Sequence, residues 1–434
     1  MPDGLRIVYV SNSPPEHPII GGRQRTNLLL RALRRIGTLE LHLLSAPEAL
    51  MTAEELAATH AVHGPTVFCR VTPKGARWPF APVRRLYPRL IDRLAHNTLS
   101  RSIDFRLDPL ASRPLIEALR GGAAAGRGIG LVVGRYLSPA MRGGAGEARR
   151  FGVPSILDID DVETTTYQSR LEGRGLPAWE RAVLRRHVRQ LERAVPDARR
   201  AFDHAWVCSP SDVALVDHPS VSVLPNLPYA PPESPIAPQP MPEPGSAAAR
   251  TAMVIASWNY TPNHRGLDRF LERVWPGVVR EVPGAALAVA GSKMSPEQRE
   301  RWGRVPGVTI TGFLPSLDHG YRGCLFAVSP IYNGGGTKIK VIEALAHGRT
   351  CVCTAHSHRG YEATLPAGEA IPVAPDDAAM TRACVELFRQ PARAAALGQA
   401  GRALIERHYS FGAFAAEVER SVERVLRQRP GVAG

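Results

Sequence analysis

The feature that most constrains the fold of this chain is an alternation of short apolar runs with amphipathic, helix-like segments, which occurs twice along its length. In the first half, LRIVYV (5–10) precedes a helical pattern at 23–37, and LELHLL follows at 39–44. The alternation restarts at TAMVIAS (251–257) and continues to AIPVAP (370–375). Strands that alternate with helices predict parallel sheets covered by helices on both faces. We therefore expect an α/β protein with two doubly wound, Rossmann-like parallel-sheet domains.

The same pattern supplies the remaining secondary-structure predictions. The other strands of the first half are expected at 66–71, 130–136, 154–160, 204–209 and 220–226. Those of the second half are expected at 285–291, 308–314, 325–331 and 350–355, after a helix near 266–281. From Asp376 to about Arg427 the sequence predicts helix throughout.

A proline-rich segment, LPYAPPESPIAPQPMPEPGSAAAR, interrupts the alternation after Asn226. Such a composition is typical of an extended, semi-rigid linker. The predicted organisation is an N-terminal domain at 1–228, a linker at 229–250, a C-terminal domain at 251–410, and a helix at 411–434 that can cross back to the N-terminal domain. Ligands of doubly wound sheets bind at the carboxyl ends of the strands, so a cleft shared by the two domains is the expected site.

Composition indicates a globular protein. Of 434 residues, 44% are apolar and 22% are charged, which is ordinary for a chain with a large core. The N-terminal apolar run, Leu5 to Val10, is too short for a signal-peptide core, and no run reaches the roughly 18 residues of a membrane span. We expect a cytoplasmic protein whose six scattered cysteines are buried free thiols.

The net charge of +14 raises the question of an anionic partner. One segment, 74–101, carries seven basic residues and a single aspartate, interleaved with aromatic and aliphatic residues. Such a segment fits peripheral contact with an anionic membrane face or an anionic acceptor, and it fits a solvated arginine-rich helix face equally well. Nucleic-acid binding is not expected, because no aromatic-plus-basic strand pattern of the usual modules is present.

Glycines stand at two strand-to-helix turns. Gly21 and Gly22 precede the first helix, where backbone N–H groups and the helix dipole can meet an anion. Taken alone, a glycine pair at such a turn is more often steric than functional, and the spacing is not that of a dinucleotide fingerprint.

The stretch SPIYNGGGTKIKVIEALAHG (329–348) is more informative. A helix is expected to begin near Thr337, with its hydroxyl, free backbone N–H groups and Lys338 at the positive end of the dipole, where a diphosphate fits. Lys340 points elsewhere around that helix. Glu343 lies in an apolar run and needs a polar partner, such as a pair of sugar hydroxyls. The plainer alternative is a helix with solvated lysines and a Glu343–arginine pair.

The run GGGTKIKVIEALAHGRTCVCTAHSHRGYE resembles the donor-binding signature of the glycosyltransferases group 1 family, retaining enzymes of the GT-B fold. The resemblance covers most of 251–375, with a weaker match at GGRQRTNLLLRAL. It implies two Rossmann-like domains facing across a cleft, an acceptor-binding N-terminal domain, and a nucleotide-sugar-binding C-terminal domain.

Position by position, the resemblance implies roles for single residues. Glu343 matches the glutamate that holds the ribose hydroxyls, and Arg265 matches the basic residue that neutralises the donor diphosphate. Lys338 and Lys340 match basic positions near the same phosphates. Gly22 matches a loop of the N-terminal domain that closes against the donor.

Three positions depart from the family pattern. Gly335 stands where many members carry a glutamate that contacts the transferred sugar, and Asn259 stands where an arginine is frequent. The donor sugar is then expected to be held mainly by backbone amides of Gly334 to Thr337, including Gly336. Asp160, in SILDIDDVETTTY, occupies the place of a family histidine at the reaction centre.

A carboxylate at position 160 can accept the proton of an acceptor hydroxyl or stabilise an oxocarbenium ion. For any one of Asp158, Asp160 and Asp161, capping of the next helix or pairing with Arg135 or Arg170 is the more frequent role.

The resulting hypothesis is a hexosyltransferase-type glycosyltransferase of polysaccharide biosynthesis that moves a sugar from a nucleoside-diphosphate-sugar co-substrate to an acceptor, lipid-linked or polysaccharide, with retention. Asp160, Arg265 and Lys338 are the expected catalytic residues. Neither a cofactor nor a metal is expected, because no Asp-x-Asp stands at the donor site. Two alternatives remain: a nucleotide-sugar epimerase or hydrolase of the same fold, and a catalytically silent nucleotide-sugar-binding scaffold.

Overall fold

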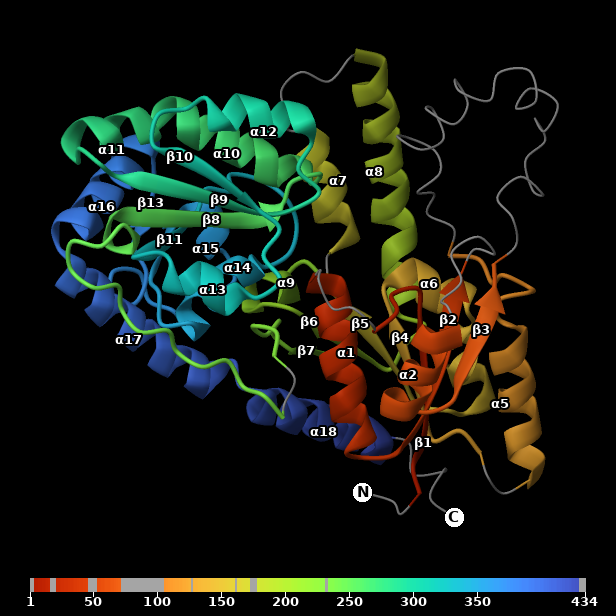
Figure 1. Ribbon diagram of the computed structural model, residues 1–434. Helices are drawn as coiled ribbons and strands as arrows, with labels where there is room; N and C mark the ends of the chain where they lie inside the picture. The colour runs from red at the N-terminus through yellow and green to blue at the C-terminus, as the bar shows by residue number, and fades with distance from the viewer. Residues whose placement is uncertain are drawn as a thin grey trace. The chain divides into compact units, whose positions relative to one another are not determined.

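A computed structural model describes residues 4–15, 21–45, 53–71, 105–125, 128–160, 162–171, 178–230 and 233–428 (Figure 1). The chain divides into two compact units. The first contains Met1–Leu224 together with Phe414–Gly434, and the second contains Pro225–Ala413. The segment 74–101, for which membrane or acceptor contact is expected, lies outside the described residues.

The first unit is built on a parallel seven-stranded sheet in the order β3-β2-β1-β4-β5-β6-β7. Its strands are β1 (Arg6–Ser11), β2 (Thr38–Ser45), β3 (Thr66–Arg70), β4 (Leu131–Arg135), β5 (Ser155–Ile159), β6 (His204–Val207) and β7 (Val221–Val223). Its helices are α1 (Gly21–Arg34), α2 (Ala53–His63), α5 (Arg113–Ala125), α6 (Leu137–Arg142), the 3₁₀ helix η3 (Ala145–Phe151), α7 (Glu163–Leu171), α8 (Ala178–Arg199), α9 (Pro210–Val213) and most of α18 (Phe411–Arg427). All five residues of β4 and of β5 are buried, as expected for parallel strands covered on both faces.

The second unit contains a parallel six-stranded sheet in the order β10-β9-β8-β11-β12-β13. Its strands are β8 (Thr251–Ser257), β9 (Ala286–Ser292), β10 (Val308–Gly312), β11 (Phe326–Ser329), β12 (Cys351–Thr354) and β13 (Val373–Ala374). Its helices are η4 (Ala248–Arg250), α10 (Thr261–Arg273), α11 (Trp275–Glu281), α12 (Pro296–Gly303), α13 (Leu317–Arg322), α14 (Ile339–Ala346), α15 (Ala355–His358), α16 (Asp377–Arg389) and α17 (Pro391–His408). Helices α10 and α12 cover one face of the sheet, and α14 and α17 lie on the other (Figure 1).

The expected fold class is confirmed, since both units are doubly wound α/β structures with parallel sheets. The helix expected near 266–281 is instead two helices, α10 and α11. Pro276 lies in the first turn of α11, and its ring and missing N–H prevent one continuous helix. For the same reason, the helical end of the chain is divided at Pro391, where α17 begins.

The proline-rich segment is part of the second unit. The buried Arg349 donates hydrogen bonds to the carbonyls of Gln239 (3.0 Å) and Pro240. Arg402 donates to the carbonyl of Ile236 at 2.8 Å. Proline has no N–H group, so a proline-rich segment cannot form the regular backbone hydrogen bonds of a strand. Here arginine side chains satisfy its carbonyl groups instead and hold the segment against the rest of the unit.

Six buried cysteines are free thiols, as expected. Those of Cys351 and Cys353 project from the same face of β12, with their sulfur atoms 3.7 Å apart.

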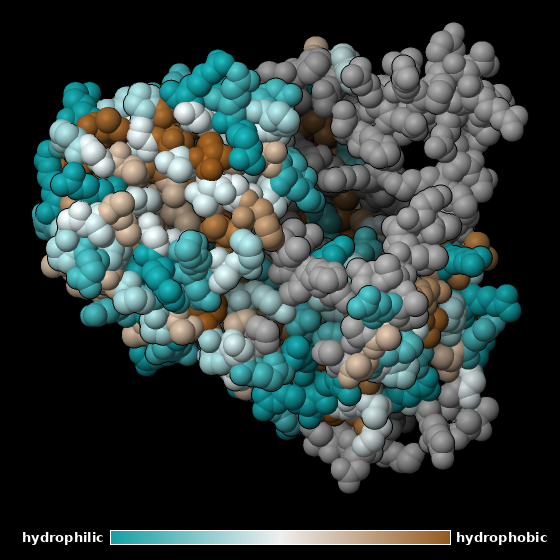
Figure 2. All heavy atoms as spheres, viewed as in Figure 1, coloured by the Kyte–Doolittle hydropathy of each residue, from teal (hydrophilic) through white to brown (hydrophobic). Residues whose placement is uncertain are grey.

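No helix in the described ranges is both long and apolar enough to span a membrane. On the face shown in Figure 2, the second unit presents hydrophilic residues with separate small hydrophobic groups over its helices.

Candidate active site

In each sheet the order of strands reverses at one point. The reversal lies between β1 and β4 in the first unit and between β8 and β11 in the second. Connections leave neighbouring strands in opposite directions there, and the carboxyl ends of the two strands are the usual binding site of such sheets. The residues predicted to act lie on the segments that follow β1 and β5 in the first unit and β8 and β11 in the second.

In the second unit, the strand β11 leads into a glycine-containing loop, residues 330–338, before α14 begins at Ile339. Gly334 and Gly336 have positive φ angles of 111° and 62°, which only glycine adopts readily. The Lys338 ammonium group donates hydrogen bonds of 2.7 Å to the carbonyls of Gly335 and Gly336. The prediction that the helix starts near Thr337 is wrong by two residues, because Lys338 still has a non-helical backbone (φ −94°, ψ 82°).

The orientation of the loop amides follows from these bonds. In a trans peptide the C=O of one residue is antiparallel to the N–H of the next. With the carbonyls of Gly335 and Gly336 directed at the Lys338 ammonium, the N–H groups of Gly336 and Thr337 point away from it. Neither N–H donates a hydrogen bond to any part of the chain that the structure describes.

The start of α10, after β8, lies against this loop. A Cβ on Gly266 would stand 2.1 Å from the carbonyl oxygen of Pro330, so only glycine permits the observed approach. A Cβ on Gly334 would stand 3.1 Å from the Tyr260 hydroxyl. Arg265, beside Gly266, is exposed and makes no ion pair or hydrogen bond within the described chain.

The two lysines have different partners, as the sequence predicts. Lys340 donates to the side-chain carbonyl of Asn263 on α10 at 2.8 Å. Burial lowers the pKa of Lys340 to about 8, and the nearby charge of Glu343 opposes that shift. Glu343 itself is 9% exposed, on the buried side of α14.

The remaining donor candidates lie on the same two loops. The Thr337 hydroxyl accepts a hydrogen bond of 3.1 Å from the Asn226 amide. Asn259 is exposed after β8 and accepts from the Ser257 hydroxyl at 2.9 Å. His356 was not identified from the sequence; its Nε2 donates to the Gly334 carbonyl at 3.0 Å, and burial lowers its pKa to about 4, so the ring is neutral at pH 7.

In the first unit, charged side chains gather at the carboxyl ends of β4 and β5. Asp158 is completely buried and binds two arginines, Arg25 of α1 and Arg135 of β4. Arg25 donates from Nε to both carboxylate oxygens at 3.1 Å, and from Nη1 to the Leu224 carbonyl at 2.8 Å. A buried carboxylate between two guanidinium groups is compensated for its lost hydration.

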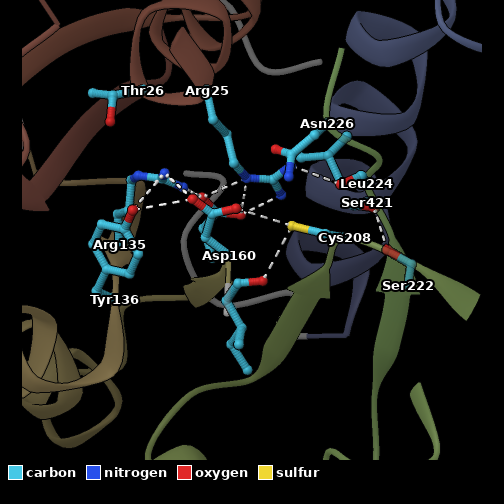
Figure 3. Close-up of polar contacts among 12 residues, drawn as sticks. Arg25, Thr26, Arg135, Tyr136, Asp160, Cys208, Ser222, Leu224, Asn226 and Ser421 are labelled. Atoms are coloured by element: carbon cyan, nitrogen blue, oxygen red, sulfur yellow. Dashed lines mark hydrogen bonds and ion pairs between the residues drawn. The ribbon is translucent and has the colours of Figure 1, made fainter. Parts of the chain in front are cut away.

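Asp160 lies two residues further along the chain, directly after β5, and joins the same cluster (Figure 3). Its Oδ2 accepts from Arg135 Nη2 at 2.8 Å and from the Tyr136 hydroxyl at 3.0 Å. Its Oδ1 accepts from the Cys208 thiol at 3.3 Å. The side chain is 13% exposed. The pairing of Asp160 with Arg135, the plainer of the roles expected for it, is therefore present.

Gly22 belongs to the same cluster. Its carbonyl accepts hydrogen bonds of 3.0 Å from Arg135 Nη2 and from the Thr26 hydroxyl. A Cβ at position 22 would stand 2.7 Å from the Tyr136 hydroxyl. The glycine therefore leaves space for a phenol that reaches Asp160, and its predicted contact with the donor stays a prediction.

Comparison with known proteins agrees with this architecture. Residues 249–390 match a family model described as Glycosyl transferases group 1. The chain is therefore similar to the group 1 glycosyl transferases over this segment, which lies in the second unit. No curated protein matches the sequence significantly.

Solved structures show the same fold at low identity. Sucrose-phosphate synthase from Thermosynechococcus elongatus is 15% identical with a TM-score of 0.63, covering 98% of this chain and 99% of that one. Alr3699/HepE from Anabaena, in complex with UDP and glucose, is 10% identical with a TM-score of 0.61, covering 97% and 99%. TarM is 11% identical with a TM-score of 0.52; the match covers 67% of this chain and 54% of TarM. These glycosyltransferase folds confirm the GT-B architecture.

Among the described residues, no group of three or more His, Cys, Asp or Glu side chains is arranged to hold a metal ion. Asp158 and Asp160 are engaged by arginines, which are poor neighbours for a cation. Independence from metal stays a prediction.

Proposed function

We propose that this glycosyltransferase moves a hexosyl group from a nucleoside-diphosphate sugar, bound by the second unit, to a hydroxyl group of an acceptor bound by the first unit. The observation that carries the proposal is the loop at 330–338. Its Gly336 and Thr337 amides are turned away from Lys338 and donate no bond within the described chain. Such amides at the carboxyl end of a strand are suited to an anionic ligand.

The donor residues then divide the work. Glu343 binds the ribose hydroxyls, while Arg265 and Lys340 neutralise the diphosphate. Lys338 orients the loop by binding its carbonyls and adds a positive charge near the diphosphate. The backbone of Gly335 contacts the sugar in place of a side chain. Asn259 lies on the facing loop with Arg265 and is assigned to the same ligand.

The barrier in this reaction arises from charge that develops on the departing diphosphate. Cations and amides fixed in advance stabilise that charge without reorganising, which is the largest contribution in many enzymes. Asp160 is assigned to the acceptor side, where an ionised carboxylate accepts a hydroxyl hydrogen or stabilises a positive sugar. No cofactor or metal is needed in this scheme, and retention is proposed from the family resemblance.

Two further parts of the proposal concern the biosynthetic role of the enzyme and its location in the cell. We assign the reaction to polysaccharide or lipid-linked glycan assembly in the cytoplasm, with peripheral contact at the inner membrane face through 74–101. The support is the concentration of basic and aromatic residues in that sequence.

A panel of nucleotide sugars tests the proposal. Thermal shift with UDP-, GDP-, ADP- and TDP-linked hexoses should select one donor, which stabilises the protein by mass action. Release of the nucleoside diphosphate should then increase with an acceptor and persist in EDTA. Equal turnover with donor alone would instead indicate an epimerase or hydrolase, and binding without any turnover would indicate a scaffold.

A further inference from the structure

We propose that Tyr136 is a positioning residue of the reaction: its hydroxyl, together with Arg135, holds Asp160 ionised and fixed toward the acceptor. Tyr136 follows β4 at the point where the strand order of the first sheet reverses. The inference rests on the proposed function and assigns a residue that no sequence motif identified.

The backbone of Tyr136 is the first observation. Its φ of 57° with ψ of 130° is a conformation that side chains with a Cβ rarely adopt. Among the described non-glycine residues, only Lys293 also has a positive φ. Residues held in such conformations cluster at functional sites, where the surrounding structure maintains them. A glycine here would relieve the strain, so a tyrosine in its place points to a use for the side chain.

The surroundings of the backbone maintain that conformation. The Tyr136 N–H donates to the carbonyl of Asp158 at 3.1 Å, and its own carbonyl accepts from Ala140 N–H at 3.0 Å as α6 begins. The N–H of Tyr136 thus binds β5, and its carbonyl accepts the first hydrogen bond of α6. The phenol is consequently directed by main-chain bonds on both sides.

The side chain is directed equally firmly. The guanidinium of Arg135 lies 4.4 Å above the centre of the Tyr136 ring, and its Nη2 donates to the Tyr136 oxygen at 3.1 Å. The hydroxyl then donates to Asp160 Oδ2 at 3.0 Å, in the space that Gly22 leaves open. Figure 3 shows Arg135, Tyr136 and Asp160 converging. Arg135 and Tyr136 therefore bind the same carboxylate oxygen from adjacent positions in the chain.

This arrangement controls the charge of Asp160. A hydrogen bond donated to a carboxylate favours its ionised form, so losing the bond raises the pKa. Among the described residues, the groups around Asp160 include the cations Arg25 and Arg135, the neutral donors Tyr136 and Cys208, and the anion Asp158, which its two arginines compensate. Burial raises the pKa of the Cys208 thiol well above its usual value, so it stays a neutral donor. Tyr136, which donates to the same carboxylate oxygen as Arg135, is a contact that can be removed without removing a charge.

The test compares Tyr136→Phe with wild type, using the donor that the panel selects and its nucleoside-diphosphate release. We expect kcat to fall about tenfold with the KM for donor unchanged, and the acidic limb of the pH–rate profile to move up by about one pH unit, as for loss of one hydrogen bond to a charged group. Tyr9→Phe is the matched control: it removes a buried phenol from the adjacent strand β1 that does not contact Asp160, and it should leave the acidic limb in place.

A double-mutant cycle completes the test. If Tyr136 acts through Asp160, Tyr136→Phe should have no further effect on kcat in an Asp160→Asn protein. Additive losses, an unmoved acidic limb, or an Asp160→Asn protein with wild-type kcat would each overturn the assignment of Tyr136. Absence of turnover in the wild type with every donor would instead reject the proposed function, so the two failures are distinguishable.

Discussion

The two strand-order reversals of this protein carry opposite kinds of polar chemistry. At the first, Arg25, Arg135, Asp158 and Asp160 bind one another, so each charge is compensated within the protein. At the second, the Lys338 ammonium donates to the carbonyls of Gly335 and Gly336, and Arg265 is exposed. The first arrangement fixes a carboxylate, whereas the second is suited to an added anion. In the proposed reaction, the first arrangement would serve the acceptor and the second the donor.

The largest effect on this contrast is expected from the loss of the Asp158 carboxylate. Asp158→Ala should lower the free energy of unfolding by about 3–5 kcal/mol, because Arg25 and Arg135 would remain buried without their shared carboxylate. Urea unfolding would measure the loss. Glu117→Ala, which removes the exposed partner of Arg113, serves as the control and should change the midpoint little. An equally small change at Asp158 would show that the cluster adds no stability.

At the second reversal, the largest effect is expected from Gly266→Ala. The added Cβ would meet the Pro330 carbonyl, so the loop at 330–338 must move away from α10. Donor affinity should fall by about 100-fold, the typical cost of misplacing a binding group by an ångström. Gly303→Ala at the end of α12 is the matched control, since its Cβ would have only an ordinary 3.6 Å contact. Unchanged donor affinity in Gly266→Ala would contradict the placement of the donor at this loop.

A smaller loss is expected from Glu343→Gln, which keeps the shape of the side chain but removes its charge. Exchanging a charged acceptor for a neutral one beside the ribose should weaken donor binding about tenfold. Titration by thermal shift would report it, with exposed Glu300→Gln as the control. A donor analogue lacking both ribose hydroxyls should bind the two proteins alike, and a persistent difference would argue against ribose recognition.

The smallest effect concerns pH. Because burial lowers the pKa of Lys340 to about 8, its charge is present below that pH and lost above it. Donor affinity should therefore fall a few-fold as pH rises from 7 to 9, and Lys340→Met should flatten the profile. Between pH 8 and 10 the unfolded chain binds more protons at this lysine than the folded one does, so this group alone makes stability rise with pH. A profile shared by Lys340→Met and wild type would assign the pH dependence elsewhere.

Local pattern was sufficient for much of the fold. The strand predicted at 251–257 is β8 with the same bounds, because an uninterrupted apolar run between polar residues has few other solutions in a parallel sheet. The glycine loop and Glu343 could also be predicted as parts of an anion and sugar site, because they lie within one short segment of the sequence. The helix begins two residues later than Thr337 because the backbone of Lys338 is not helical, which a helix pattern in the sequence does not reveal.

The cluster of the first unit could be predicted only in part. Asp160 and its pairing with Arg135 were visible as charges at the ends of apolar strands. Arg25 and Asp158, by contrast, are 133 positions apart in the chain. Their contact depends on β1 lying beside β4 and β4 beside β5, which only the order of strands determines. Tyr136 gives no signal at all in sequence, because nothing in the letters GRY indicates a positive φ.

The division of the chain also has a consequence for biosynthesis. The first unit includes the last part of α18, whose Val418, Val422 and Val425 are buried and whose Ser421 hydroxyl lies 3.1 Å from that of Ser222. The ribosome therefore releases the final piece of the first unit last. The second unit, which is continuous in sequence, can finish folding earlier, so the order of completion reverses the order of synthesis. Until α18 has been synthesised, the first unit lacks the apolar residues that this helix contributes to it.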